Sequence, residues 1–538
     1  MSPGRIWLSM EAGRRGSVVP LLRPHLCPSV VWYLGLFLFG AGLILYASSS
    51  WGIGVRVDSL SYLTAARSLA DGKCLCWLGS GLELKPLVHF GPAYPILLAA
   101  VARAVGDTVA AARLISALLY GANLVVAGLA IHLLTGRFLA GVLCTFLVGA
   151  SPAIVQAHDS AMSEPVYFLL LMAGMGALAL YLRGARRFYL FLAIGFSALA
   201  VLARYAGAVV IPAGVLGILV LSPAPRKSAG RDAALFAVGA SLPFVLWTLR
   251  NIIVAGTATN RVLGSHLITG DDARKFLEVV TAWLTSAKPS HWLEGFVLGL
   301  VLAGLSWLLW RRCRSSDDHV AAGAVLGLLW LIFAFLYIPY LAFSRSFLDA
   351  KIPIDDRMLS PFYLALAFAV STAVAVVPPR SYRPWAEVVG IGIVLLLAGP
   401  RMLTGSAGVL SHLRNEGVGF TDGAWQSSSS IDWLRRLPPD ATVYSNKAHV
   451  IQLLLERAAF QLPERYDEVK ALPRSDFEQG LAVMRSDLQR PHSYLLYLDP
   501  DNPAASRKAA DQFTVGLVPI LIMSDGVVFA RRPNGSSP

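Results

Sequence analysis

Apolar blocks, each about 15–22 residues long, recur along the chain between Val30 and Pro400. A helix needs roughly 20 apolar residues to cross the hydrocarbon core of a bilayer, or about 17 at the short end. Only 15% of the 538 residues are charged, against about 25% in a typical soluble protein. The pattern therefore predicts a mainly α-helical, polytopic membrane protein.

Eleven of these blocks are predicted to cross the membrane. A further apolar stretch, residues 92–105, is only about 14 residues long and opens with Gly91-Pro92, so we expect it to lie in the membrane interface. This assignment decides on which side of the membrane each later joint between blocks lies. The predicted spans are residues 30–48, 112–134, 138–153, 165–182, 188–203, 207–222, 233–249, 295–310, 319–341, 358–377 and 385–400.

With the N-terminus inside, the joints between spans separate by charge. Cytoplasmic joints of membrane proteins carry an excess of Lys and Arg, and the predicted inner joints are basic. They hold Arg137, Arg183, Arg186, Arg187, Arg226, Lys227, Arg231, Arg311, Arg312, Arg314, Arg380 and Arg383. The predicted outer joints hold Asp58, Asp159, Glu164, Asp271, Asp272, Asp355 and Asp356. An odd number of spans then places the C-terminus outside.

Three parts follow from this pattern. We expect a cytoplasmic tail at residues 1–29, a transmembrane domain at residues 30–401 with an outer loop at residues 49–91, and an extracytoplasmic α/β domain at residues 402–538. In the last part, short apolar runs replace the long blocks, and such runs indicate strands. Strands are predicted at residues 442–445, 493–498, 515–523 and 527–531, the second and third of them buried, and a helix is predicted at residues 449–457.

The net charge of +13 does not indicate a nucleic-acid partner, because the basic residues lie in short joints between apolar blocks. The five cysteines, Cys27, Cys74, Cys76, Cys144 and Cys313, show no zinc-ligand spacing. A disulfide between Cys74 and Cys76 would be strained, so the sequence leaves their state open.

Three joints on the predicted outer face carry acidic residues in compact motifs. Charge at the water edge of a membrane bundle is costly and usually functional. The motifs therefore indicate an active site at one face of the membrane. They are Asp58-Ser59-Leu60-Ser61-Tyr62, His158-Asp159-Ser160-Ala161-Met162-Ser163-Glu164-Pro165 and Asp355-Asp356-Arg357.

A series of motifs, in a fixed order along the chain, resembles the GT-C superfamily of membrane glycosyltransferases. Within it the chain resembles the branch of the protein O-mannosyltransferases, the aminoarabinose transferase of lipid A and the bacterial RgtA/B/C/D-like enzymes. The motifs are Asp58, Tyr62, Ala66 and Leu69 in D-x-x-x-Y-x-x-x-A-x-x-L; Lys85-Pro86; Pro92-Ala93-Tyr94-Pro95; residues 112–118 in A-R-L-x-S-A-L; Asp159 and Glu164 at the second acidic motif; and residues 247–256 in W-x-x-R-N-x-x-x-x-G.

The resemblance implies an inverting glycosyltransferase in a bacterial plasma (inner) membrane. It would move a sugar from a polyprenyl-phosphate or diphosphate donor to an acceptor hydroxyl at the outer face. Asp58 is expected to be the general base, with Asp159 or Glu164 as a second carboxylate, and which of these two acts stays open. A phosphate leaving group needs cations, and the candidates are Arg357, Lys85, Arg250 and Arg204. Further substrate contacts are expected from Tyr62, His89, His158 and Asp356.

The expected partners are the lipid-linked donor, membrane lipids and an acceptor that is a lipid, a glycan or a protein; nucleic acid is not expected. No cofactor is assigned and no metal-ligand set stands out, and the need for a divalent cation stays open. Two alternatives to a transferase also stay open, namely a transporter or flippase of lipid-linked saccharides and a non-catalytic membrane assembly protein. Transporters often carry internal repeats, and no repeat is seen in the sequence.

Each candidate residue could also serve the fold alone. Asp58 and Asp159 could each cap a helix start. Glu164 could begin a helix with Pro165 in its first turn, where a negative charge interacts favourably with the helix dipole. Asp355 or Asp356 could simply form an ion pair with Arg357 or Lys351. Lys85 and His89 could be solvated loop residues, and His158 could be a core residue. Arg204 could anchor the end of a span at the membrane interface.

Overall fold

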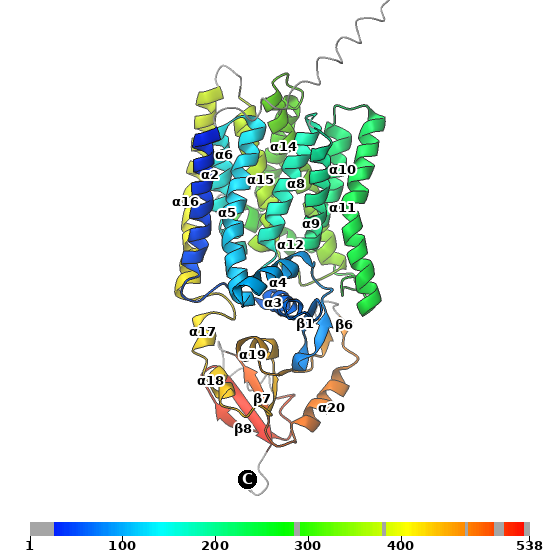
Figure 1. The fold of residues 1–538 in the computed structure, drawn as a ribbon, viewed down its shortest axis with the longest axis vertical. Coiled ribbons are helices and arrows are strands. Elements are labelled where there is room, and N and C mark those ends of the chain that lie inside the picture. Colours follow the sequence, from blue (N-terminus) through cyan, green and yellow to red (C-terminus); the bar gives the residue numbers. More distant parts are fainter. Residues whose placement is uncertain are drawn as a thin grey trace, which may run out of the picture.

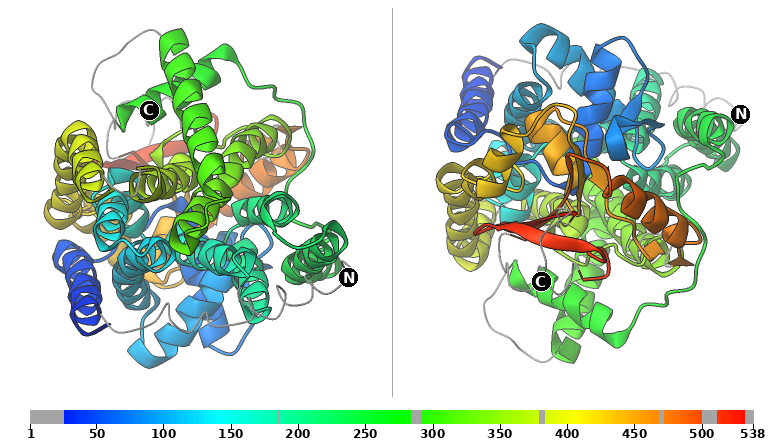
Figure 2. Two further views of the ribbon diagram at one scale, coloured as in Figure 1. Left: turned by 90° about the horizontal axis from the view of Figure 1, so that it is seen from above. Right: turned by 90° about the horizontal axis from the view of Figure 1, so that it is seen from below.

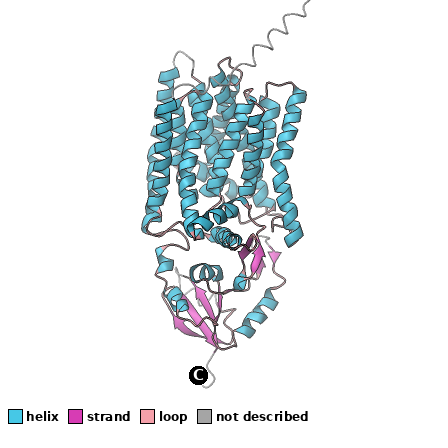
Figure 3. Ribbon diagram, in the orientation of Figure 1, coloured by secondary structure: helices cyan, strands magenta, loops and turns pink. Residues whose placement is uncertain are grey.

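An α-helical bundle carries a small α/β domain at one of its ends (Figure 1). The computed structural model describes residues 26–184, 186–283, 291–378, 383–467, 472–499 and 511–531. Almost all strands lie in the C-terminal domain, and the bundle is helical throughout (Figure 3). The mainly α architecture predicted from the apolar blocks is therefore confirmed.

Eight helices in the described residues are long and apolar enough to cross a membrane, or nine if a bent pair counts as one span. The bent pair is α6 (Phe138–Gly149) and α7 (Pro152–His158), which meet at 63°. Helices α9 (Phe188–Ala203) and α10 (Val210–Leu221) match two further predicted spans but are shorter than a full span. The eight are α2 (Leu26–Ala47), α5 (Thr108–Thr135), α8 (Glu164–Leu182), α11 (Arg226–Ala255), α13 (His291–Arg312), α14 (Asp318–Phe347), α15 (Asp356–Val376) and α16 (Arg383–Asn415).

Helix α16 extends well beyond the predicted span at residues 385–400 and through the predicted domain boundary at residue 402. Pro400 lies inside this helix, and a membrane helix tolerates proline where neighbouring groups compensate for the lost hydrogen bond. The extension is held by packing: the Ser406 hydroxyl donates to the carbonyl of Ala150 at 2.8 Å, and Leu413 is fully buried. The chain leaves the bundle only after Asn415.

Two helices lie across the end of the bundle, between it and the C-terminal domain (Figure 1). They are α3 (Val57–Ala70) and α4 (Ala93–Val105), which pack on each other. Helix α4 is the apolar stretch that we expected in the membrane interface. Between the two helices lie a hairpin of β1 (Cys76–Leu78) and β2 (Leu84–Pro86), the 3-10 helix η3 (Ser80–Leu82) and a disulfide between Cys74 and Cys76. Helix α12 (Gly270–Ala282) lies at the same end.

A five-stranded sheet in the order β4-β3-β7-β9-β8 forms the C-terminal domain. Strand β3 (Thr442–Ser445) pairs in parallel with β4 (Phe460–Gln461) and β7 (Ser493–Leu498), whereas β9 (Gly526–Arg531) pairs antiparallel with β7 and β8. Strand β8 (Leu517–Ile522) was predicted to be buried, which is wrong, because it lies at the sheet edge with its last four residues exposed. The domain also contains α17 (Gly423–Gln426), α18 (Ser429–Arg435), α19 (Ala448–Leu455), α20 (Phe477–Asp487) and a small hairpin of β5 (Tyr466–Asp467) and β6 (Leu472–Pro473).

Backbone and side-chain hydrogen bonds join the C-terminal domain to the outer loop. The amide of Gly81 donates to the carbonyl of Ala459 at 2.9 Å, and the Gln452 side chain donates to the carbonyl of Gly79 at 3.1 Å. An ion pair of 2.7 Å connects Arg67 on α3 with Glu456. Seen from below, the domain lies over the middle of the bundle end (Figure 2). The outer loop is therefore held between the bundle and the C-terminal domain.

Candidate active site

Asp58 lies in the first turn of α3, and its carboxylate faces another part of the chain. Its Oδ2 accepts a hydrogen bond from Nη2 of Arg357 at 2.5 Å. The N-cap position of α3 belongs to Arg56, whose backbone N–H donates to the Ser59 hydroxyl at 3.0 Å. The capping role considered for Asp58 is therefore wrong, and the carboxylate serves an ion pair between two distant segments.

Glu164, the first residue of α8, is the buried centre of this arrangement, with 1% of its side chain exposed. Its Oε1 accepts from Nε of Arg357 and from Nη1 of Arg204, each at 2.7 Å. Among the described residues nothing donates a hydrogen bond to Oε2, although this atom is also buried. Burying a charge is costly unless it is paired, and two guanidinium groups supply that pairing here.

The four residues Asp58, Glu164, Arg204 and Arg357 form what we call the charge cluster. They come from α3, α8, the junction after α9 and the start of α15, so four segments far apart in sequence converge. Arg357 bridges the two carboxylates, and its side chain is 24% exposed, compared with 30% for Asp58. The outer edge of the cluster is thus open to solvent while its Glu164 end is sealed.

Tyr62 packs one turn after Asp58 on the same helix. Its ring contacts Phe90 and Tyr94, and its hydroxyl lies 3.2 Å from the hydroxyl of Ser163. Burial raises the pKa of Tyr62 above its ordinary value, and the nearby Asp58 carboxylate adds to the effect. The phenol therefore stays protonated and holds the start of α8 against α3.

His89 is half-buried in the outer loop and lies within electrostatic reach of Asp58 and Arg261. Burial lowers its pKa to about 4, and the positive charge of Arg261 acts in the same direction. The imidazole is therefore neutral near pH 7. It can exchange hydrogen bonds with a substrate, but it supplies no charge to a phosphate.

Arg250 and Lys85, two of the predicted phosphate ligands, have partners outside the charge cluster. Arg250 donates to the carbonyl of Leu87 at 3.1 Å and stacks on Trp247, so it anchors the return of the outer loop to α11. Lys85 lies on strand β2 and forms an ion pair with Glu83 at 3.3 Å. The structure brings Arg357 and Arg204 together and leaves these two cations elsewhere.

The two acids of the second motif lie in different surroundings. Glu164 belongs to the charge cluster, whereas Asp159 forms an ion pair with Arg56 at 3.2 Å and accepts a hydrogen bond from Ser160. Asp159 is almost fully buried, which raises the pKa of its carboxyl group, while Arg56 opposes that rise. Arg56 was not among the predicted site residues, although it lies only two residues before Asp58 in the sequence.

His158 and Asp356 have structural partners. Both ring nitrogens of His158 are engaged, with the Asn123 amide at 3.0 Å and the carbonyl of Ile154 at 2.7 Å. These contacts favour a structural role over a substrate contact. Asp356 accepts a hydrogen bond from the Trp283 indole at 2.7 Å. Asp355 caps α15 by accepting from the amide of Met358, so both acids serve contacts other than an ion pair with Arg357.

No group of three or more His, Cys, Asp or Glu side chains in the described part of the chain is arranged to hold a metal ion. In the charge cluster, the two carboxylates already bind guanidinium groups. The carboxylates of the charge cluster therefore do not form a cation site.

Solved structures resemble this chain in fold, although no family model and no curated protein matches its sequence. ArnT from Cupriavidus metallidurans, bound to undecaprenyl phosphate, aligns with a TM-score of 0.52 and 14% identity over 95% of this chain and 100% of that one. Arabinofuranosyltransferase AftD from Mycobacteria gives 0.56 and 15%, covering 94% of this chain and 40% of that longer one. The apo Archaeoglobus fulgidus oligosaccharyltransferase gives 0.55 and 13%, covering 90% and 71%. The chain therefore has the GT-C-like membrane fold that the sequence predicted.

Proposed function

We propose that this integral membrane protein is an inverting glycosyltransferase that uses a polyprenyl-phosphate or diphosphate sugar as its donor. The observation that carries the proposal is the contact of Arg357 with both Asp58 and Glu164. This contact places the Asp58 carboxylate, which can take a proton, beside the Arg357 guanidinium, which can hold a phosphate, at one end of the helical bundle. The neighbours in fold support it, since one is bound to undecaprenyl phosphate and another is named an arabinofuranosyltransferase.

The donor phosphate would bind at the guanidinium of Arg357, with Arg204 behind it. A guanidinium holds two oxygens of a phosphate at once, and Glu164 fixes the orientation of both arginines. Arg357 has five N–H groups and gives one each to Asp58 and Glu164. The N–H groups that remain on Nη1 and Nη2 can therefore bind the phosphate while Asp58 keeps its contact.

Asp58 would then accept the proton of the acceptor hydroxyl. The acceptor oxygen forms a bond to the anomeric carbon while the bond from that carbon to the phosphate oxygen breaks, and its electron pair leaves with the polyprenyl phosphate. Arg357 and Arg204 stabilise the negative charge that develops on this leaving group. A single displacement inverts the anomeric configuration.

The test is transfer of a radiolabelled sugar from a polyprenyl phosphate by purified protein in lipid. Donors that carry mannose, arabinose, glucose and galactose would be compared, with membrane glycan fractions as acceptors. We expect label to move from the lipid to the acceptor phase with at least one donor and inverted linkage. Movement of the intact lipid-linked sugar across a vesicle bilayer, without cleavage, would instead identify a flippase.

The site would face the outside of a bacterial plasma membrane, with the C-terminal domain on the same side. We therefore predict that alkaline phosphatase fused after Pro538 is active in cells, because this reporter folds only outside the cytoplasm. The same reporter fused after Gly136, at the opposite end of α5, should be inactive. Activity only in the Gly136 fusion would reverse the orientation and overturn this placement of the site.

A further inference from the structure

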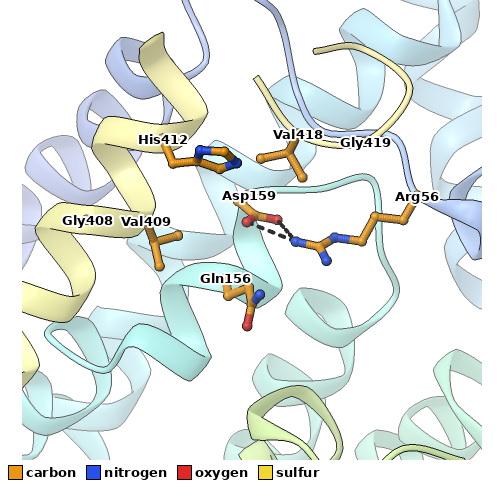
Figure 4. Close-up of a pocket in the computed structure, with 8 residues that line it drawn as sticks. All are labelled: Arg56, Gln156, Asp159, Gly408, Val409, His412, Val418 and Gly419. Carbon is orange, nitrogen blue, oxygen red and sulfur yellow. Dashed lines mark hydrogen bonds and ion pairs between the residues drawn. The ribbon is translucent and has the colours of Figure 1, made fainter. Parts of the chain in front are cut away.

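A polar pocket with a volume of about 500 Å³ lies at the start of α3, and the chemistry described above does not use it. Its size falls within the range of small-molecule sites, roughly 300–1,000 Å³. We call it the Asp159 pocket; Figure 4 shows its walls. It is lined by Arg56, Gln156, Asp159, Gly408, Val409, His412, Val418 and Gly419.

Backbone pairing fixes the walls of this pocket. Segments at residues 54–55, 159–161 and 418–420 form parallel bridges, with the amide of Gly54 donating to the Asp159 carbonyl at 2.8 Å and the amide of Val55 to the Val418 carbonyl at 3.1 Å. Gly419 has a φ of +68°, and a Cβ there would lie 2.2 Å from the carbonyl oxygen of Val55. The pocket is therefore a built feature of the junction between α3, α7, α16 and the start of the C-terminal domain.

The chemistry of the lining suits a neutral ligand with many hydroxyl groups. Arg56 and Asp159 cancel each other in charge, and His412 lies 3.1 Å from Glu416. The Gln156 amide adds a donor and an acceptor, so hydroxyl groups would find both kinds of partner. An anion meets no unpaired cation among the lining residues, and Val409 and Val418 alone offer too little apolar surface for a lipid chain.

The position of the pocket relates it to the proposed reaction. Arg56 is the N-cap of α3, two residues before Asp58, so one helix start connects the pocket to the charge cluster. The lipid-linked donor must approach from the bilayer, whereas the pocket lies where α16 leaves the bundle toward the C-terminal domain. A ligand that extends from the pocket along the start of α3 would thus approach Asp58 from the side of the C-terminal domain.

We propose that the Asp159 pocket binds a neutral saccharide, and that this saccharide is the acceptor. The second part of this proposal, that the saccharide is the acceptor, rests on the proposed function. It identifies the acceptor as a glycan and not as a protein or a lipid. Arg56, Asp159 and Gln156 hold its hydroxyl groups. One further hydroxyl of the bound saccharide points to Asp58 and becomes the nucleophile.

Gly408→Trp is the decisive variant. Gly408 lines the pocket, and a Cβ at this position meets no atom within 4 Å, so the indole can fill the pocket without strain on the helix. Gly392→Trp is the matched control. Gly392 lies on the same helix and is exposed like Gly408, and a Cβ at this position also meets no atom within 4 Å. Gly392 does not line the pocket. Saturation-transfer difference NMR with the methyl glycosides of mannose, galactose, glucose, arabinose and rhamnose measures binding without any need for catalysis.

We expect at least one methyl glycoside to bind the wild type and Gly392→Trp, and to lose at least about tenfold in affinity in Gly408→Trp. Inorganic phosphate should not displace it. Binding that survives in Gly408→Trp, displacement by phosphate, or no binding of any glycoside to the wild type would each overturn the proposal. If Gly408→Trp does not fold, Gln156→Ala and His412→Ala decide the question, since unchanged affinity in both also overturns it.

This binding test separates the two proposals. If Gly408→Trp abolishes saccharide binding but the protein transfers no sugar from any polyprenyl donor, the proposed binding site stands and the proposed transferase function is refuted. If the protein transfers sugar to a glycan and Gly408→Trp leaves the acceptor KM unchanged, the proposed transferase function stands and the proposed binding site is refuted.

Discussion

Asp58→Asn is expected to reduce sugar transfer by about 10²–10⁴-fold, the usual contribution of a positioned general base, while the protein stays folded. Asn keeps the shape of the side chain and can still accept a hydrogen bond from Arg357, but it cannot take the proton of an acceptor hydroxyl. Helix α3 should be little affected, because its N-cap is Arg56 and not Asp58. Initial rates of radiolabel transfer by purified, monodisperse protein measure the effect.

Asp71→Asn is the control for this loss. Asp71 ends the same helix, is half-exposed and forms a surface ion pair of 3.7 Å with Lys73, so its change removes an equal charge from α3 away from the site. Exposed pairs contribute roughly 0–1 kcal/mol, and transfer should stay near the wild-type rate. Transfer at the wild-type rate by well-folded Asp58→Asn would refute the role of Asp58 as the base.

Much of the fold could be predicted from local pattern alone. The length and apolarity of the blocks indicated the bundle, and the shortness of residues 92–105 indicated helix α4 on the bundle end. Helix α16 continues past the predicted boundary at residue 402, because the contacts that extend it come from α7 and α2, which the local pattern does not show. Burial of strand β8 failed for a similar reason: an apolar run does not show whether a strand lies at the centre or the edge of a sheet.

The site was predictable as a set of motifs but not as a geometry. The acidic joints indicated Asp58, Glu164 and Arg357, and the structure brings these three into contact. Nothing local separated Glu164 from Asp159, five residues before it, because their partners, Arg357 and Arg56, come from other segments. For the same reason, the sequence did not show that Lys85 and Arg250, two of the predicted phosphate ligands, contact residues outside the charge cluster.

Arg357→Lys is expected to raise the donor KM by about 10–100-fold although the charge is kept. A guanidinium presents two parallel N–H groups to a phosphate and, in this structure, one each to Asp58 and Glu164, whereas an ammonium is a point charge that does not reproduce this fork. Loss of one charge-assisted hydrogen bond costs about 1.5–3 kcal/mol, which corresponds to that change in affinity. Steady-state kinetics at varied donor concentration provide the KM.

Arg357→Ala should have the larger effect, on folding as well as on activity. Removing one partner of a buried ion pair costs about 3–5 kcal/mol, because Glu164 would keep only Arg204 and Asp58 would lose the guanidinium that it binds. Arg345→Lys is the matched control, since Arg345 is buried to a similar degree and pairs with Asp272 outside the charge cluster. A purely structural role for Arg357 predicts lower thermal stability in both Arg357 variants and an unchanged donor KM per folded molecule. The phosphate role requires instead that the donor KM rises in Arg357→Lys while Arg345→Lys leaves it unchanged.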